Sequence, residues 1–470
     1  MNEHDMIVEN IAGTIASAFK CEKRLQFKKN STNTIRPPNS FGNDCIDLRI
    51  LNRILSIDGE SNSVDVEPAV PMDALVRFCL KYGYVPPVVP EFPGITVGGA
   101  IQGGALESSS FRYGQFNDIV LELELLLGDG TRIVATANNE YADLFWGVST
   151  SYGSLAIITR AKLRLIHAEP YVNLTLRRFD SPNGCKDAIF STVAAANPFD
   201  FIEGLVLSES FSVGIFGALG REPLGNIRRF KRNIDPWYYR FVAKAVDAEP
   251  SFSVPLEDYL FRYDKGGFWM GEYVFPIFGL SSNTVTRFLF APFLHTRKLY
   301  DGLFALGRQQ ESVIQDLYLD KSDVESVFRF NAERSKIYPL WLCPIRSTTT
   351  NQRLSSHSRH KQMTLLNVGI YGKPESGDAI SATRDLEHMI LASGKSRKML
   401  YALTLMKEVD FWRSYDKDWY ERLRDKYHAK TFTDIHKKIF SDGSAPRQTF
   451  SRGLAILIFE SLRGKNVVWW

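Results

Sequence analysis

The sequence predicts an α+β fold of two or three domains, and three observations support this prediction. The chain has 470 residues, more than a single hydrophobic core usually organises. Residues 90–114 (PEFPGITVGGAIQGGALESSSFRYG) hold six glycines and a run of three serines, which is typical of a loop that lets a ligand or another chain come close. A strand–turn–strand pattern follows at 119–137, with Gly128-Asp129-Gly130 at the turn. Residues 25–170 are therefore expected to form a mixed unit whose strands converge on glycine-containing loops.

The composition is typical of a globular protein in a reducing compartment. Apolar residues make up 44% and charged residues 23%, and a formal charge of +4 gives no indication of a nucleic-acid partner. The five cysteines are scattered without a CxxC pair, so neither a disulfide framework nor a metal site is predicted. The sequence has neither a basic signal peptide nor an apolar run of bilayer length. We expect a cytoplasmic protein, with peripheral contact to a membrane left open and the oligomeric state unknown.

Before the glycine-rich stretch, the sequence predicts a helix, a loop, two strands and a second helix. A helix is expected over residues 1–20, where four apolar residues recur at a spacing of four: Ile7, Ile11, Ile15 and Phe19. Residues 28–44 are polar and contain proline and glycine, so a loop is expected there. Short strands are expected at 45–48 and 63–67, and residues 71–82 have the apolar face of a helix.

After the glycine-rich stretch, the sequence predicts a sheet with a second glycine loop beside it. Residues 119–127 and 131–137 are expected to pair as a hairpin, and residues 158–166 alternate polar and apolar side chains like a third strand. A short helix is expected from Asp143. Residues 151–155 (SYGSL) are expected to form the second loop.

The spacing of the glycines indicates what the loops could hold. The pattern Gly-Gly-x-x-x-Gly-Gly at 98–104 matches neither GxGxxG nor a P-loop, and no lysine stands where a P-loop needs one. Backbone N–H groups and serine hydroxyls can replace lysine as donors to phosphate oxygens. A phosphate-rich ligand is therefore predicted.

An ordered set of motifs resembles the vanillyl-alcohol-oxidase-type (PCMH-type) FAD-binding fold. The motifs are Thr96-Val97-Gly98-Gly99, Gly103-Gly104, Ser109, Tyr113-Gly114, Asp118, Leu127-x-Asp129-Gly130, Asp143-Leu144-Phe145-Trp146 and Gly153-Ser154-Leu155. Within that family, ESSSFRYG, the VEP before the second helix and PLWLCP at 339–344 resemble the delta-24-sterol reductase (seladin/Diminuto-like) branch. The resemblance extends from about residue 30 to about residue 440.

The resemblance implies a domain order and a cofactor. Residues 1–170 would form the FAD-binding domain, residues 171–400 an α+β substrate or cap domain with a central sheet, and residues 401–470 a stretch that returns to complete the flavin site. It implies that these residues bind FAD: Thr96, Val97, Gly98, Gly99, Gly103, Gly104, Ser108, Ser109, Tyr113, Gly114, Gly153, Ser154 and Ile157. No histidine lies in either flavin loop and no cysteine lies between Cys79 and Cys185, so the flavin is expected to be non-covalent.

The central region is expected to hold the substrate. The basic run at 226–232 (NIRRFKR) is interpreted as a solvated face, with a site for an anionic group as the alternative. The aromatic run at 259–273 could be core or pocket. Residues 283–304 could touch a membrane or form a buried helix of the cap, and the buried helix is favoured. Residues 365–372 and 399–406 are expected to be strands.

The expected chemistry follows from what flavin requires. A flavin enzyme must place the reacting carbon over N5 and supply or remove a proton nearby. The candidate catalytic residues, chosen by type and neighbourhood, are Glu272, Tyr371, Tyr401 and Arg346. The resemblance implies an FAD-dependent oxidoreductase that transfers hydride to or from an apolar small molecule, as in alkene reduction or desaturation on a terpenoid or sterol-like skeleton, with NADPH as a candidate reductant. An oxygen-using alcohol oxidase and a non-redox cyclase or isomerase remain alternatives.

Overall fold

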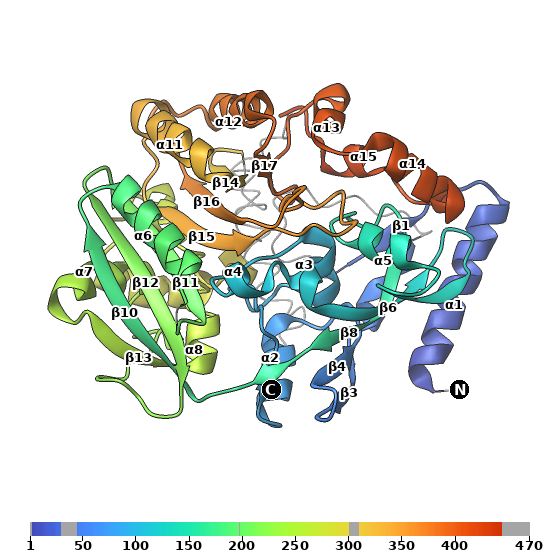
Figure 1. The fold of residues 1–470 in the computed structure, drawn as a ribbon, viewed down its shortest axis with the longest axis horizontal. Helices are drawn as coiled ribbons and strands as arrows, with labels where there is room; N and C mark the ends of the chain where they lie inside the picture. The colour runs from blue at the N-terminus through green and yellow to red at the C-terminus, as the bar shows by residue number, and fades with distance from the viewer. Residues whose placement is uncertain (1, 30–44, 197, 300–309, 444–470) are drawn as a thin grey trace.

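The computed structural model describes residues 2–29, 45–196, 198–299 and 310–443. Most of the loop expected at 28–44 and the residues 444–470 of the last expected segment lie outside these ranges. The expected α+β fold is confirmed: a five-stranded sheet occupies the N-terminal part and an eight-stranded sheet the central part. Figure 1 shows the two sheets side by side, with the C-terminal helices returning to the N-terminal part.

The N-terminal sheet is antiparallel and has the order β3-β4-β8-β6-β7. Its strands are β3 (Ile54–Asp58), β4 (Ser63–Val66), β8 (Ile157–Arg164), β6 (Val120–Leu126) and β7 (Arg132–Thr136). The expected hairpin is present as β6 and β7, with Glu122 opposite Thr136. Two small sheets flank it: β1 (Gln26–Lys28) with β2 (Cys45–Asp47), and β5 (Tyr84–Val85) with β9 (Ile166–His167).

Helices cover the N-terminal sheet and shape the glycine-rich stretch. They are α1 (Glu3–Lys20), α2 (Met72–Leu80), α3 (Val97–Gly103), α4 (Ser110–Tyr113) and α5 (Ala142–Val148). The expected helix over 1–20 is α1, and its buried stripe includes Val8, Ile11 and Ile15. The prediction of a glycine-rich loop over 90–114 was wrong in part, because α3 and α4 form within it. The side chain of Thr96 caps α3 and Gly104 ends it in the left-handed region.

The central sheet has the order β13-β10-β12-β11-β15-β16-β14-β17, and its paired strands are antiparallel. The strands are β10 (Tyr171–Phe179), β11 (Phe201–Ser208), β12 (Phe211–Gly220), β13 (Ser251–Pro255), β14 (Val313–Leu319), β15 (Leu340–Arg346), β16 (Thr364–Gly372) and β17 (Arg397–Lys398). The expected strand at 365–372 is β16. The strand expected at 399–406 was wrong, since pairing ends at Lys398.

The two faces of the central sheet are buried differently. Apolar side chains of one face share a buried cluster with α6 (Pro182–Ala194), α11 (Lys321–Phe330) and α12 (Ala379–Ser393). Figure 1 shows these three helices along the sheet. The alternation of a strand places the next residue on the opposite face. We call that opposite face the inner face; it carries Glu203, Asp316, Tyr318, Trp341, Cys343, Asn367 and Tyr371. Buried polar groups are thus concentrated on one side of the sheet.

The remaining central helices lie along the inner-face core, and one of them contradicts the sequence prediction. They are α7 (Tyr238–Ala248), α8 (Leu256–Leu260) and α9 (Thr284–Phe290). The interpretation of residues 283–304 as a buried helix was wrong for α9, which contains no buried residue. Beyond α9, Ala291, Leu294, Thr296 and Leu299 are buried. Helical periodicity identifies an apolar stripe but does not say which side of the helix faces the core.

The C-terminal helices complete the core of the N-terminal part. They are α13 (Glu408–Ser414), α14 (Lys417–Lys426) and α15 (Ile435–Ile439). Phe411, Tyr420 and Leu423 belong to the same buried cluster as the β6 and β8 side chains. The contact is close at Gly128, where an added Cβ would lie 1.9 Å from the carbonyl oxygen of His428. Residues from both ends of the chain therefore share one core.

Candidate functional site

The first glycine loop is held by contacts that only glycine permits. A Cβ at Gly98 would lie 2.7 Å from Cβ of Pro68. Gly104 has φ +67°, and a Cβ there would lie 2.6 Å from Cγ2 of Thr150. At Gly103, by contrast, a Cβ would meet nothing within 4 Å. The loop is therefore packed against protein at Gly98 and Gly104 and has open space beside Gly103.

The second glycine loop lies directly against the first. Oε1 of Gln102 accepts hydrogen bonds from the backbone N–H of Gly153 at 2.7 Å and from Oγ of Ser151 at 3.0 Å. The Tyr152 hydroxyl donates to the carbonyl oxygen of Gly103 at 3.3 Å. The predicted residues Gly98–Gly104 and Gly153–Ser154 are therefore brought together into one surface, which sequence spacing alone left as two separate loops.

Two lysines reach this surface from distant parts of the chain. Nζ of Lys438 donates to the carbonyl oxygens of Tyr152 at 3.0 Å and Gly153 at 2.8 Å. A Cβ on Gly153 would lie 3.6 Å from Nζ of both Lys29 and Lys438. Arg424 donates to the carbonyl oxygen of Ser154 at 2.6 Å. Sequence reasoning missed these cations, because no local motif connects residue 29 or 438 with residue 153.

The other residues predicted for the cofactor lie in different surroundings. Val97 and Ile157 are buried in two different apolar clusters. Tyr113 packs against the cluster that contains Val97. Oγ of Ser109 donates to the carbonyl oxygen of Pro87 at 2.7 Å, and Oγ of Ser108 lies 3.0 Å from the Tyr259 hydroxyl. Ser108 therefore joins the N-terminal part to the central part, whereas Ser109 binds within the N-terminal part.

Gly114 belongs to the same junction. It has φ +82°, and a Cβ there would lie 2.2 Å from Oδ2 of Asp118. That carboxylate accepts hydrogen bonds from the Gln115 N–H and lies 2.7 Å from Nε2 of His357. The Gln115 side chain in turn donates to the Tyr318 hydroxyl on the inner face at 2.9 Å. The segment after α4 is thereby anchored to the central sheet.

A buried carboxyl group, Asp316, lies at the centre of the inner face. It accepts hydrogen bonds from the Tyr371 hydroxyl at 2.6 Å, the Tyr401 hydroxyl at 2.5 Å and Nδ2 of Asn367 at 2.7 Å. Burial raises the pKa of Asp316 above its ordinary value, although the three hydrogen bonds oppose the shift. The structure thus brings Tyr371 and Tyr401 together on an acid that sequence reasoning missed. An aspartate within the mostly apolar run VIQDLYL of β14 was the available signal.

A second buried group of charges surrounds Arg262. Its Nε donates to Glu203 at 2.9 Å, and its guanidinium stacks over the Tyr259 ring at 4.0 Å. Glu203 also accepts from Tyr263 at 3.1 Å and from the Trp341 indole at 2.8 Å. The Arg262 side chain is fully buried, and Glu203, Tyr259 and Ser108, which it contacts, are buried as well. This group connects the inner face to the segment that carries Ser108, to which Arg262 donates at 3.2 Å.

Glu91 adds a further acid between the two parts. Burial, and secondarily the neighbouring Glu107 carboxyl, raise the pKa of Glu91 well above its usual range. Burial also raises the pKa of Glu107, against the opposing charge of Arg262. The Glu91 carboxyl, when ionised, contributes to the raised pKa of Tyr371, which places both groups in one region. Three buried carboxyls, those of Glu91, Glu107 and Glu203, surround Arg262, and the raised pKa of Glu91 favours its protonated form.

The remaining predicted catalytic residues lie apart from Asp316. Glu272 accepts from the Tyr239 hydroxyl at 2.6 Å and from Arg240 at 2.7 Å. Burial raises the pKa of Glu272, but these hydrogen bonds outweigh it, and the net pKa is lowered. Arg346 is exposed at the end of β15 opposite Thr364. Thr364 is seven residues from Tyr371 along β16, or about 24 Å at the usual rise of a strand.

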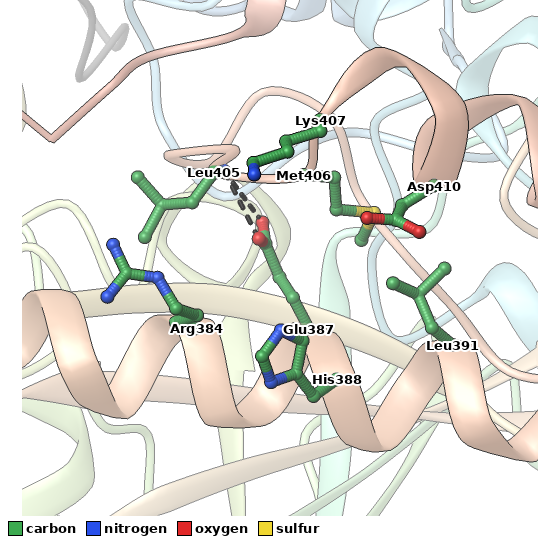
Figure 2. Close-up of a pocket in the computed structure, with 8 residues that line it drawn as sticks. All are labelled: Arg384, Glu387, His388, Leu391, Leu405, Met406, Lys407 and Asp410. Carbon is green, nitrogen blue, oxygen red and sulfur yellow. Dashed lines mark hydrogen bonds between the residues drawn. The ribbon is translucent and has the colours of Figure 1, made fainter.

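A cavity outside this site lies between α12 and the segment that leads into α13. It has a volume of about 410 Å³ and is bordered by Arg384, Glu387, His388, Leu391, Leu405, Met406, Lys407 and Asp410. Figure 2 shows the Glu387 carboxylate pointing toward the Leu405 backbone, whose N–H donates to it at 3.0 Å. Glu387 also accepts from Nζ of Lys398 at 2.8 Å. Its carboxylate is therefore engaged within the protein.

Comparison with known proteins identifies the family. The FAD binding domain family matches residues 9–136. Delta(24)-sterol reductase of Homo sapiens is 30% identical over 403 residues, which are 82% of this chain and 76% of that protein. This chain belongs to the Delta(24)-sterol reductase family. The reductase of Pisum sativum is 28% identical over 433 residues, 84% of this chain and 76% of that protein.

The Delta(24)-sterol reductase family assignment makes the chain an FAD-linked oxidoreductase. A more distant relative, decaprenylphosphoryl-beta-D-ribose oxidase of Mycolicibacterium smegmatis, is 36% identical over 124 residues, or 26% of this chain and 27% of that protein. The surface of the two glycine loops fits FAD, because it combines open space at Gly103 with two ammonium groups that match the charge of a diphosphate. No helix within the described ranges is both long and apolar enough to cross a membrane.

Proposed function

We propose that this chain uses FAD to reduce a carbon–carbon double bond in an apolar, sterol-like or terpenoid-like molecule. The observation that carries the proposal is the Asp316 carboxyl with its raised pKa, buried beside two tyrosine hydroxyls. Reduction of an alkene needs an acid for one carbon, whereas oxidation of an alcohol needs a base. An acid that resists ionisation is suited to the first reaction. The names of the relatives add support for a sterol-like substrate.

The glycine loops would hold FAD without a covalent bond. The backbone of Gly98–Gly104 and Gly153–Ser154 would bind the diphosphate, and Lys29 and Lys438 would balance its charge. None of the residues in these two loops is a histidine or cysteine. When bound and reduced, the flavin supplies hydride at N5, and NADPH is the proposed source of the electrons. The C-terminal segment 401–470 would complete the site through Arg424 and Lys438.

The inner face would orient the substrate and deliver the proton. Phe268 lies 5.1 Å from the Tyr371 ring and 5.2 Å from the Trp341 ring, so aromatic surface adjoins the acid. Burial keeps the pKa of Tyr371 well above its ordinary value, so its hydroxyl remains protonated. Tyr371 or Tyr401 would give its proton to the substrate carbon while protonated Asp316 replaces it. Residues 1–170 and 171–400 would thus serve as cofactor and substrate domains.

The test is anaerobic reduction of the FAD-loaded protein, followed by substrate. We expect NADPH to bleach the flavin absorbance and a Δ24-sterol to restore it, with one solvent deuterium in the product when the reaction is run in D₂O. Flavin that NADPH leaves oxidised would exclude NADPH as the reductant. Oxygen-dependent peroxide release with an alcohol, and no sterol reduction by chemically reduced protein, would contradict the alkene-reductase proposal and favour an oxidase.

A further inference from the structure

An apolar stripe on α9 faces solvent. Val285, Phe288, Leu289 and Phe293 recur at the i, i+3, i+4 and i+8 positions that share one side of a helix. Their exposed fractions are 66%, 50%, 63% and 54%. Phe278 and Leu280, just before α9, are also exposed, at 38% and 37%. We call these six side chains the outer stripe. The water-exposed surface of a monomeric protein rarely has so many large apolar side chains within one short segment.

The outer stripe is a fixed feature because the opposite side of α9 is anchored. The Phe290 ring packs on the buried Phe275 ring at 5.9 Å. The Asn283 side chain caps the helix by accepting from the backbone N–H groups of Val285 and Thr286. The helix therefore cannot turn its apolar stripe inward without losing these contacts.

The charge around the outer stripe indicates the chemistry of its partner. Residues 278–298 contain no aspartate or glutamate but carry Arg287, Arg297 and Lys298. Nζ of Lys298 lies 5.5 Å from the centre of the Phe293 ring, at the edge of the stripe, and Lys298 is exposed. Arg297 is paired with Asp73 at 2.7 Å, and the Arg287 guanidinium lies 5.8 Å from the buried Trp237 ring, so Lys298 supplies the available positive charge beside the stripe. An apolar stripe bordered by a cation and free of acidic neighbours in sequence is the pattern of helices that lie in a membrane interface.

Aromatic contacts connect the outer stripe to the inner face. Phe275, which supports α9, lies 6.5 Å from Trp237. Trp237 lies 6.4 Å from Tyr239, and Tyr239 lies 5.8 Å from Trp269. The Trp269 indole donates to the carbonyl oxygen of Tyr371 at 2.6 Å. The surface that faces solvent and the acid-bearing sheet are therefore joined by continuous aromatic packing.

We propose that the outer stripe docks this protein on the surface of an anionic lipid bilayer, with α9 lying in the interface. The six apolar side chains would enter the acyl boundary while Lys298 contacts anionic headgroups. Docking on the bilayer does not depend on which reaction the protein catalyses. Direct uptake of an apolar substrate from the bilayer, which docking would allow, rests on the proposed function.

The test measures partitioning of the FAD-loaded protein onto vesicles of equal parts phosphatidylcholine and phosphatidylserine. The variants Val285→Glu and Leu289→Glu should each weaken partitioning about tenfold, since each removes one apolar side chain that would enter the bilayer. Lys298→Glu should reduce the preference for these vesicles over pure phosphatidylcholine. Val409→Glu on α13 is the matched control, because Val409 is 71% exposed outside the stripe, and it should bind like the wild type.

Several outcomes would overturn the proposal. These are a wild-type protein that stays off both kinds of vesicle, a double variant that binds as well as the wild type, and a control that binds equally poorly. A wild-type dimer that the double variant separates into monomers would instead make the stripe an interface between copies. Flavin retention and thermal unfolding confirm that the variants are folded. Sterol reduction in detergent reports on the proposed function separately, since it needs no vesicle.

Discussion

Gly103 and Gly104 are neighbours that should respond differently to the same substitution. Gly104 has φ +67° and contacts Thr150, whereas Gly103 borders open space. Gly104→Val should lower the free energy of unfolding by at least about 2 kcal/mol, from backbone strain and the clash. Gly103→Val should leave the unfolding of the apo-protein nearly unchanged and abolish FAD retention, because the added side chain enters the proposed diphosphate space. Thermal unfolding and flavin absorbance measure the two effects; a yellow Gly103→Val protein would refute the placement.

Asp316→Asn tests the proposed proton source. The turnover rate should fall by about 10²- to 10⁴-fold, the usual contribution of a positioned acid, while flavin retention stays unchanged. The pKa of Asp316 is raised in the folded state, so the wild type loses active, protonated enzyme as pH rises through that value. The rate of Asp316→Asn should not show this decrease with rising pH. Tyr401→Phe removes one hydrogen-bond donor to Asp316 and should still show the decrease, but at higher pH, since the lost hydrogen bond lowered the pKa of Asp316.

The same shift has a consequence for stability. Because the folded pKa exceeds the ordinary value of 3.8, the folded state binds the proton more tightly than the unfolded state. Stability from this group is fully present below the ordinary value and is lost as pH rises through the folded pKa. The difference in unfolding free energy between wild type and Asp316→Asn should change over that window and be constant above it. A flat difference throughout would mean that the pKa of Asp316 is not raised in the folded state.

At the scale of elements, the C-terminal helix α15 contributes a single cation to the glycine loops. Lys438→Ala should weaken FAD binding about tenfold, because a charge-assisted contact is removed. Lys437→Ala is the matched control: its side chain is exposed on the same helix. Fluorescence titration of the apo-proteins with FAD measures both affinities. Equal affinity for the two variants would show that α15 does not contact the cofactor.

Elements with strong periodicity could be predicted from the sequence, whereas their orientation and partners could not. The hairpin β6–β7 and helix α1 follow from alternation and a spacing of four. The sequence prediction placed the apolar side chains of α9 in the core, because the spacing of apolar residues does not show which side of a helix faces the core. Tyr371 and Tyr401 were identified by residue type, but Asp316 joins them only through the pairing of β14 with β16. Pairing between strands that are far apart in the sequence cannot be predicted from the residues of either strand alone.

At the scale of the whole molecule, Arg262 ties the N-terminal part to the central sheet. It is fully buried between Glu203, Tyr259 and Ser108. Arg262→Met should lower the free energy of unfolding by about 3–5 kcal/mol, because the Glu203 carboxylate is left buried without its partner. Adding Glu203→Gln should recover part of that loss. Denaturant unfolding of both variants gives the comparison; an unchanged midpoint for Arg262→Met would show that the Arg262–Glu203 pair does not stabilise the fold.

The close contact between Gly128 and His428 has a consequence for synthesis in the cell. The hairpin turn that Gly128 begins leaves the ribosome early, yet the backbone packed against it is 300 residues later in the sequence. At the usual rates of translation this interval lasts about 15 to 60 s. During that time the apolar surface later covered by Phe411, Tyr420 and Leu423 is open. Nascent chains are therefore expected to bind chaperones until α14 emerges, and the flavin to be captured only near the end of translation.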